Sequence, residues 1–427
     1  MKVAENARKG ITVPLNSKER EMSAVQAAWR FYNNANVDVQ ELFGMVESQS
    51  KEAIKKIRGD YVPIAHDWSW LDYRGHHAKE DLIKRNNRSH AKSVGYDLQS
   101  SLLIDPNNGV PLAPVALNLK TARKIHSTYR EDLKPELSHL EELAKRCVYL
   151  QSVIKDKKPV HIVDREADSV LFMRRLQEED ALFIIRVKNN AGVYWNDKKR
   201  KIRQKELTEE LGLGREVGWV KYHKKRARLF VNECDVTLTR PHHQRVIDED
   251  GKRKSLRIPG EPVEARFIVS KVVDTQNNIL ATWMLMSNLS HEVSAQTISR
   301  WYYYRWNIES YFKLLKTTGF NLEKWQQEKP EALFKRLLVV SYAVVLVYKL
   351  ANDDTEEGRK VRAFLVKLSG KLMEYKTEYT LPALLTGLWV FLRMMDMLQH
   401  FSIDELYHLR NQVQDIMGFG LFEVGNV

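Results

Sequence analysis

The sequence contains only two cysteines among its 427 residues, Cys147 and Cys234. They lie far apart, and neither belongs to a spaced set of cysteines and histidines. The sequence therefore indicates neither a disulfide framework nor a structural zinc site. We expect a protein of a reducing compartment.

Long apolar runs are also missing. The first ten residues lack the apolar stretch of a secretory signal peptide. The longest apolar run, Leu337–Tyr348, lies between Arg336 and Lys349 and is shorter than the ~20 residues that cross a bilayer. It predicts a buried helix, and we expect no membrane partner.

Acidic residues are outnumbered by basic ones. Lysine and arginine total 68, aspartate and glutamate total 55, and the net charge is +13 with a pI near 9.4. This surplus favours a polyanionic partner, and nucleic acid is the leading class. A chain of 427 residues exceeds what one hydrophobic core usually covers, so two or more structural units are expected.

The pattern of apolar residues predicts an α/β protein with helical regions at both ends. A helix is predicted from about Asp38, and β-like runs follow it. A long helix from Lys134, a strand over 160–163, a helix capped by Asp168 and a strand over 182–187 come next. Further β-like runs then predict a mostly β region, before a chain that is mainly helical to its end.

Four side chains stand out in a late predicted helix: Tyr302, Arg305, Glu309 and Lys316. On an ideal α-helix their spacing places them within an arc of about 60°. A carboxylate between two cations suits metal-assisted phosphoryl transfer, because the acid can hold a divalent ion while the cations hold phosphates. On its own, Glu309 would more often be a surface acid paired with Lys313.

Two aspartates end predicted strands. Asp164 follows the strand over 160–163, and Asp67 follows an earlier β-like run. Each alone is as easily a turn acid that caps a backbone amide. Strand ends of α/β sheets also carry ligand-binding groups. Together with Glu309, the two acids can converge on one crevice and hold two divalent ions roughly 3.5 to 4 Å apart, which suits in-line displacement at phosphorus.

Two motifs carry a family resemblance. Residues 159–168 read Pro-Val-His-Ile-Val-Asp-Arg-Glu-Ala-Asp, and residues 302–316 fit a Tyr, Arg, Glu and Lys pattern at fixed spacing. Together they resemble the signature of the bacterial cut-and-paste DDE transposases of the insertion-sequence-four family, which includes transposon-five transposase. Similar stretches at 28–37 and 64–71 extend the resemblance over roughly residues 25–340.

The resemblance implies an RNase H-like α/β catalytic core interrupted by a mostly β insertion, with helical N- and C-terminal regions. The implied segments are a helical DNA-binding region (1–55), the first part of the core (56–190), the β insertion (191–290), the last helix of the core (291–335) and a helical region for dimerisation (336–427).

The resemblance also implies site residues. Asp67, Asp164 and Glu309 would form a DDE triad that binds two Mg²⁺ ions, or Mn²⁺. The phosphates around the cleaved DNA end would be gripped by Tyr302, Arg305 and Lys316.

Further residues match positions that contact DNA in this family. The freed 3′-hydroxyl forms a hairpin, which requires a flipped base, and Trp283 matches the tryptophan that receives it. The alternative for Trp283 is a core aromatic of the sheet. Arg186 and Lys188 match a basic position that faces DNA. The basic runs 198–201 and 223–226 are weaker candidates, because such runs are more often solvated surface.

The predicted function is a DNA transposase that cuts at terminal inverted repeats, passes through a hairpin and joins the 3′ ends to target DNA. Its partners would be double-stranded DNA and a second copy in a synaptic homodimer, in the bacterial cytoplasm at the nucleoid. Two alternatives remain open: a non-catalytic regulator or inhibitor that binds DNA or full-length transposase, and a metal-dependent nuclease without strand transfer. The family carries a further segment ahead of the region matched from Thr12, so a shortened N-terminus is expected.

Overall fold

The computed structural model of the protein describes residues 21–87, 90–129, 131–188, 190–222, 225–247 and 253–418. Backbone contacts divide the chain into two compact units, as its length led us to expect. The larger unit comprises Asp38–Lys313 and Gln327–Val345, and the smaller unit comprises the described parts of Met1–Val37, Leu314–Gln326 and Leu346–Val427. The predicted shortening of the N-terminus concerns residues outside this description.

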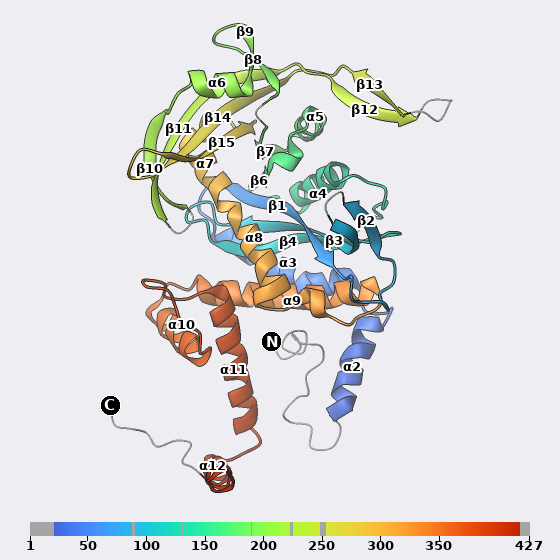
Figure 1. Ribbon diagram of the computed structural model, residues 1–427, viewed down its shortest axis with the longest axis vertical. Coiled ribbons are helices and arrows are strands. Elements are labelled where there is room, and N and C mark those ends of the chain that lie inside the picture. The colour runs from blue at the N-terminus through green and yellow to red at the C-terminus, as the bar shows by residue number, and fades with distance from the viewer. Residues whose placement is uncertain are drawn as a thin grey trace. The chain divides into compact units, whose positions relative to one another are not determined.

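The larger unit contains a sheet of 13 strands (Figure 1). These strands are β1 (Tyr61–Asp72), β2 (Ile83–Asn87), β3 (His90–Ile104), β4 (Pro111–Lys120), β5 (Ile125–Ser127), β6 (Lys158–Val163), β7 (Leu182–Arg186), β8 (Gly192–Trp195), β9 (Arg200–Arg203), β10 (Arg215–Tyr222), β11 (Lys225–Leu238), β14 (Val263–Val273) and β15 (Ile279–Ser287). Their order is β5-β4-β3-β1-β6-β7-β15-β14-β11-β8-β9, with β2 on β3 and β10 on β11. β12 (His242–Ile247) and β13 (Arg253–Ile258) form a separate two-stranded sheet.

The centre of the sheet is parallel. β1 and β7 both run parallel to β6, whereas β3 and β4 are antiparallel to their neighbours. The register pairs Ala65 with Ile162. Two residues beyond this pair come Asp67 and Asp164, so the parallel pairing brings the two acids side by side. Asp164 directly follows β6, as predicted, but Asp67 lies inside β1, so the prediction that Asp67 ends a strand is wrong: pairing with β3 continues β1 to Asp72.

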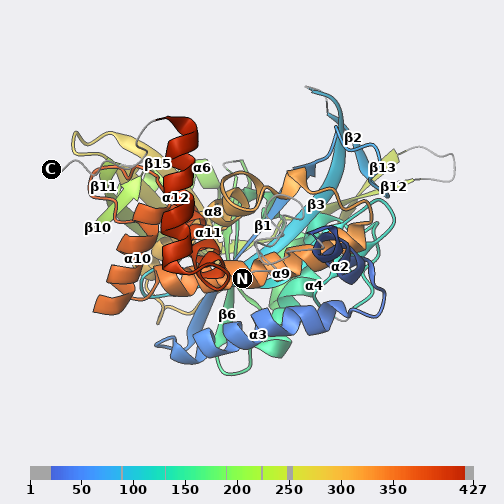
Figure 2. The ribbon, with the colours of Figure 1, turned by 90° about the horizontal axis from the view of Figure 1, so that it is seen from below.

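The helices of the larger unit are α3 (Val39–Lys56), α4 (His139–Val153), the single turn η1 (Arg165–Ala167), α5 (Val170–Glu178), α6 (Gln204–Glu210), α7 (Ala295–Tyr304) and α8 (Trp306–Lys313). One face of the central strands packs on α4 and α5, where Val163 shares a core with Cys147. The other face packs on α7, where Ile162 shares a core with Trp301. Strand β6 is buried on both faces because helices cover both, which explains its nearly continuous apolar sequence. Helix α3, drawn in blue across the lower part of Figure 2, packs on β4.

The helix predicted from Lys134 begins later, at His139. Ser138 caps it by accepting a hydrogen bond from the backbone N–H of Glu141, and the Glu141 carboxylate accepts one from the backbone N–H of Ser138. This capping box satisfies two amides that would otherwise lack partners, so it fixes the start of the helix.

The prediction that Asp168 caps a helix is wrong. Ser169 caps α5 by accepting from the backbone N–H of Phe172. The Asp168 carboxylate instead accepts from the backbone N–H of Lys188 and pairs with Arg240 at 2.8 Å. The Asp168 side chain therefore bonds to residues that are distant in the sequence and not to the helix that follows it.

The β region that follows β7 extends the same sheet, because β15 pairs antiparallel with β7. Helix α7 begins where the sequence predicts, with Ser294 as its cap. The helical segment is not continuous, however. Arg305 separates α7 from α8, and a π-helical turn, η2 (Leu314–Thr318), follows α8.

The remaining helical elements are α2 (Glu21–Asn33), η3 (Leu322–Lys324), α9 (Pro330–Ala351), α10 (Glu356–Leu368), α11 (Leu381–Leu398) and α12 (Ile403–Met417). The run Leu337–Tyr348 lies in α9 and is mostly buried, as predicted.

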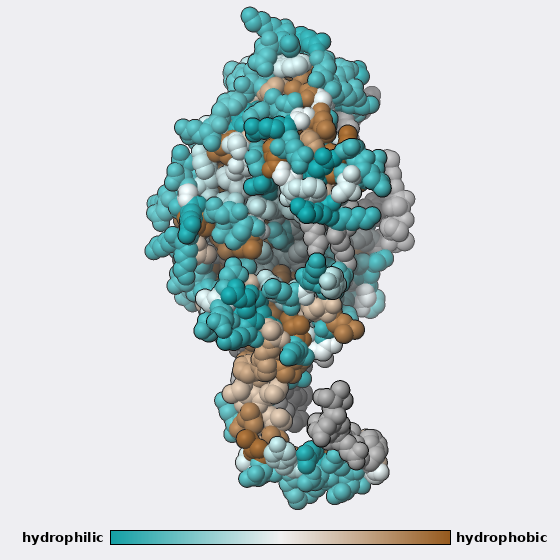
Figure 3. Space-filling view, turned by 90° about the vertical axis from the view of Figure 1, so that its left-hand side faces the viewer, coloured by the Kyte–Doolittle hydropathy of each residue, from teal (hydrophilic) through white to brown (hydrophobic). Residues whose placement is uncertain are grey.

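Among the described residues, α11 is long and apolar enough to cross a membrane, and a third of it is buried. A core helix meets the same criterion. Figure 3 shows apolar side chains gathered over this part of the surface, where Met394, Met395 and Leu398 of α11 are exposed.

Candidate active site

Arg305 joins two of the three predicted acids. Its Nη1 donates to Oδ2 of Asp67 at 3.1 Å, and its Nη2 donates to Oε1 of Glu309 at 3.0 Å. The Arg305 side chain is 7% exposed. Because water screens the contact between Arg305 and Asp67 little, the interaction of their charges is stronger than it would be at the surface.

The secondary structure explains this meeting. Asp67 lies within β1, and Glu309 lies in the first turn of α8, one helical turn after Arg305. Helix α8 packs against β1 and β3. The spacing of four residues puts Arg305 and Glu309 on one face of the helix, and that face meets the strand that carries Asp67.

Asp164 belongs to the same group. It follows β6 directly, and its Oδ1 accepts a hydrogen bond from the backbone N–H of Glu166 at 2.8 Å. Burial alone would lower the pKa of Arg305. The neighbouring Tyr302, Asp67, Asp164 and Glu309 nevertheless raise the pKa of this guanidinium above its usual value. All three predicted acids therefore lie close enough to act electrostatically on one cation.

Asp67 has an unusual protonation equilibrium. Burial raises the pKa of Asp67 to about 6, and the negative charges of Asp164 and Glu309 add to the rise. Arg305 and the hydrogen bond from the backbone N–H of Trp68 act in the opposite direction. Three acids in a partly buried cluster repel one another, so the cluster favours any cation that can enter it.

The residues present fit a divalent metal ion. The cluster offers carboxylate oxygens, the ligands that Mg²⁺ and Mn²⁺ prefer. Among the described residues, Oδ2 of Asp164 and Oε2 of Glu309 accept no hydrogen bond. The Arg305 guanidinium contacts both Asp67 and Glu309, so it competes with any cation that these carboxylates would bind.

Tyr302 and Arg186 also come together here. The Tyr302 ring is 2% exposed, and Arg186 donates a hydrogen bond to its hydroxyl. Burial raises the pKa of Tyr302. The Arg305 guanidinium lies 5.9 Å from the centre of the same ring. Tyr302 is thus a buried residue that contacts two arginines. Its hydroxyl already accepts the hydrogen bond from Arg186.

Trp283 occupies the position of a core aromatic. It lies on β15 and is 4% exposed, with ring centres 5.6 Å from Tyr302 and 6.2 Å from Tyr303. The surroundings of Trp283 therefore match the alternative interpretation, in which it is a core aromatic of the sheet. A flipped base could stack on this indole only after the surrounding aromatic side chains had moved.

Lys316 lies in the smaller unit, within the π-helical turn, and its Nζ is 3.2 Å from Oε1 of Glu323. The arc expected for an ideal α-helix therefore does not extend to Lys316, because regular α-helical spacing ends at Lys313. Lys188 is exposed, and its backbone N–H bonds to Asp168.

The two basic runs have different surroundings. In the first, Arg200 is paired with Glu210. Part of the second, residues 223–224, lies outside the described residues. Its last residue, Arg226, lies 4.1 Å from the ring centre of Trp219, which is 46% exposed. This exposed pair was not predicted. The alternation of basic and aromatic residues along β10 and β11 was the available signal.

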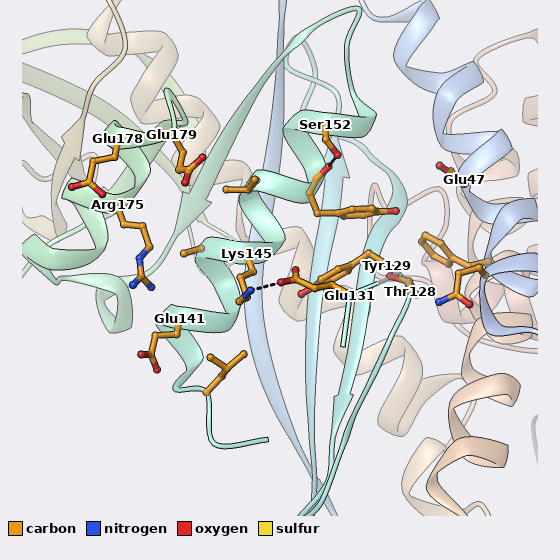
Figure 4. A pocket seen from close by; sticks show the side chains of 16 residues that line it. Glu47, Thr128, Tyr129, Glu131, Glu141, Lys145, Ser152, Arg175, Glu178 and Glu179 are labelled. Atoms are coloured by element: carbon orange, nitrogen blue, oxygen red, sulfur yellow. Dashed lines mark hydrogen bonds and ion pairs between the residues drawn. The ribbon is translucent and has the colours of Figure 1, made fainter. Parts of the chain in front are cut away.

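A separate cavity of about 940 Å³ opens among α3, α4 and α5 (Figure 4). Its lining includes Glu131, which pairs with Lys145, and the glutamates 47, 141, 178 and 179. None of the predicted site residues lines it. The excess of negative charge makes it unsuited to a phosphate backbone.

The sequence matches the model of the family described as "Transposase DDE domain" over residues 58–346, more than half of the chain. No curated protein matches it. A solved structure, described as a cryo-EM structure of a piggyBac transposase synaptic complex with hairpin DNA, is similar at 9% identity and a TM-score of 0.36. That match covers 86% of this chain and 59% of the other, and it is too distant to carry an argument.

Proposed function

The chain belongs to the transposase DDE domain family, and from that premise we propose a DNA transposase of the insertion-sequence-four type, similar to transposon-five transposase. In this proposal the protein cuts at terminal inverted repeats and joins the freed 3′ ends to target DNA. The single observation that carries it is the Arg305 guanidinium, which contacts Asp67 and Glu309 within the electrostatic reach of Asp164.

Asp67, Asp164 and Glu309 would hold two Mg²⁺ ions, with Mn²⁺ as a substitute. Bound divalent ions supply Lewis-acid stabilisation to the attacking and leaving oxygens of the phosphodiester. Arg305 holds the acids together before the ions bind. Once its contacts with Asp67 and Glu309 loosen, its fork of N–H donors suits the oxygens of the DNA phosphate.

The fold of the catalytic core in this proposal is RNase H-like. The order β4-β3-β1-β6-β7 supports it, with β1, β6 and β7 parallel and β3 and β4 antiparallel to their neighbours. The β insertion would be residues 191–290, and the C-terminal helices after 336 would contain the homodimer contacts.

DNA would lie along a positively charged surface. The net charge of +13 supports this, and Arg186 and Lys188 are the nearest basic side chains in sequence to the strand end at β7. Lys316 would reach the phosphates beside the cleaved end. Formation of a hairpin would require Trp283 to become exposed, so base flipping and opening of its aromatic cluster would occur together. The bacterial cytoplasm, at the nucleoid, is the proposed location.

The test measures nicking of DNA that carries the ends of the element that encodes this chain. Replacement of Asp67 or Asp164 with Asn, or of Glu309 with Gln, should abolish nicking and leave end binding in gel-shift assays largely intact. The matched control is Glu166→Gln, which changes an exposed acid beside the cluster and should nick normally. Full cleavage by any of the three active-site variants would refute the metal-ligand assignment.

A metal-dependent nuclease of the same fold is the second candidate, and the burial of Trp283 is the observation that favours it. Such an enzyme would cut without forming hairpins. Denaturing gels separate the two functions, because covalently closed ends migrate as one strand of double length. A regulator that binds the ends or a full-length transposase without cutting would be recognised by binding without any nicked product.

A further inference from the structure

A second group of metal-binding side chains lies on the opposite face of the sheet from the acids. His66 precedes Asp67 on β1, and neighbouring residues of a strand point to opposite faces. His161 lies on β6, and Cys147 lies on α4. All three side chains are fully buried. One ring nitrogen of each histidine and Sγ of Cys147 lie within 4.8 Å of one another.

The hydrogen bonds of this group are incomplete. Nδ1 of His66 bonds with Oγ of Ser101 at 2.8 Å, and Nε2 of His66 bonds with Nδ1 of His161 at 2.9 Å. Among the described residues, Nε2 of His161 has no partner. A buried ring nitrogen without a partner is costly. This nitrogen belongs to one of the three clustered side chains and is available to a ligand.

The chemistry of the donors selects the metal. A thiolate with two neutral imidazoles suits Zn²⁺ and does not suit Mg²⁺, which prefers oxygen. Tetrahedral Zn²⁺ sites place nitrogen and sulfur ligands roughly 3.3 to 3.6 Å apart. Since the three donor atoms already lie within 4.8 Å of one another, the side chains need to shift by no more than about 1 Å, which small rotations of the rings and the thiol would supply.

The nearest charged side chains, Arg146 and Glu142, form a buried pair. Arg146 lies beside Cys147 in α4 and is itself buried, and its positive charge is offset by Glu142, whose Oε1 is 3.1 Å from Nε. Burial raises the pKa of the Cys147 thiol, so the metal-free protein holds it as S–H. On metal binding the S–H bond breaks, a sulfur–zinc bond forms and one proton passes to the solvent.

We propose that His66, Cys147 and His161 form a zinc site that joins β1, β6 and α4, with a water molecule in the fourth position of the tetrahedron. Ser101 would remain the outer partner that orients the His66 ring, as is usual for histidines that bind metal. Since β1 and β6 also carry Asp67 and Asp164, the zinc would fix the relative position of these strands. The site itself does not depend on the proposed function.

The experiment uses the full chain, purified from zinc-supplemented cells and dialysed against metal-free buffer. Elemental analysis should find close to one zinc per chain. Cys147→Ser and His161→Gln should each lower the zinc content more than tenfold, while Cys234→Ser, which changes the other buried cysteine, should leave it unchanged. Asp67→Asn should also keep its zinc, which separates this proposal from the one about the acids.

A second measurement covers the case in which the variants fail to fold. The unaltered protein, stripped and reloaded with Co²⁺, should show the near-ultraviolet absorption of a cobalt–thiolate bond and should release about one proton per ion bound. Cys234→Ser should retain this absorption. Folded, unaltered protein that binds less than about a tenth of an equivalent of zinc, or that gives no thiolate band with Co²⁺, would overturn the proposal.

Discussion

Nη1 of Arg305 donates to Oδ2 of Asp67 at 3.1 Å, although the two residues are 238 positions apart in the sequence. This contact makes Arg305 an internal cation of an acidic cluster. The same guanidinium must leave at least part of that cluster if a divalent ion enters. The competition between the two cations is open to measurement.

We expect Arg305→Gln to bind Mn²⁺ more tightly than the unaltered protein, because the competing positive charge between Asp67 and Glu309 is gone. Isothermal titration would measure the dissociation constant. Cleavage should nevertheless fall at least tenfold, since a charge-assisted contact to phosphate is lost, and a tenfold loss corresponds to about 1.4 kcal/mol. Weaker Mn²⁺ binding by this variant would contradict the competition.

Asp67 should destabilise the metal-free protein at neutral pH. Burial raises the pKa of Asp67 in the folded protein to about 6, above its ordinary value of 3.8. The proton is therefore bound more tightly in the folded state. The stability that the bound proton contributes to the folded state is fully present below pH 3.8 and is lost as the pH rises through 6. With EDTA present, Asp67→Asn should be more stable than the unaltered protein at pH 8 by roughly 1 to 3 kcal/mol.

The gain from Asp67→Asn should largely disappear near pH 4, where Asp67 is protonated in the folded state and close to half protonated in the unfolded state. Urea denaturation at pH 8 and pH 4 would measure it. Glu166→Gln serves as the control, with no comparable gain expected because that side chain is exposed. A variant Asp67→Asn that is less stable than the unaltered protein at pH 8 would show that its pairing with Arg305 outweighs the cost of burial.

Glu142 and Arg146 form a fully buried ion pair on α4, with Nη2 of Arg146 at 3.1 Å from Oε2 of Glu142. Glu142→Gln would leave the arginine charge buried without its partner, and we expect a loss of about 3 to 5 kcal/mol. Thermal unfolding followed by circular dichroism would measure it. Glu141→Gln, one residue earlier, should cost little, because glutamine also completes a capping box.

Gly387 permits the close contact of α10 and α11. A Cβ at this position would lie 1.8 Å from the carbonyl oxygen of Leu365, a backbone atom that cannot move aside easily. Gly387→Ala should therefore separate the two helices and lower the melting temperature of the smaller unit. Gly44→Ala in α3 is the matched control, since no atom lies within 4 Å of its Cβ, and it should stabilise by about 0.5 to 1 kcal/mol. Equal effects of the two substitutions would refute the steric argument.

Much of the core fold was predictable because its signals are local. The apolar run that forms β6 and the cap at Ser294 each lie within a few residues of the element that they define. The start of α4 was placed too early, because proline suits a first turn but the capping box around Ser138 is stronger. Asp168 was misassigned since its partner Arg240 lies 72 residues away.

The candidate site was predictable in its chemistry and less so in its geometry. Asp164 follows from the end of β6 and Glu309 follows from a motif, whereas Asp67 lies inside β1, because pairing with β3 extends that strand beyond the local pattern. The burial of Trp283 depends on Tyr302 and Tyr303 from a different element, and no local pattern reveals it.

The residue types, the approximate order of the main helices and strands, and the DDE transposase family could be read from the sequence, because motifs and apolar periodicity involve residues that are close together in the chain. The contact of Arg305 with Asp67, the π-helical turn that carries Lys316 and the position of Cys147 beside His66 and His161 became visible only in the folded chain. Spacing along the chain indicated no zinc site, since the three proposed ligands come from two strands and a helix. Such contacts are set by strand register and helix packing, which bring together side chains that are distant in the sequence.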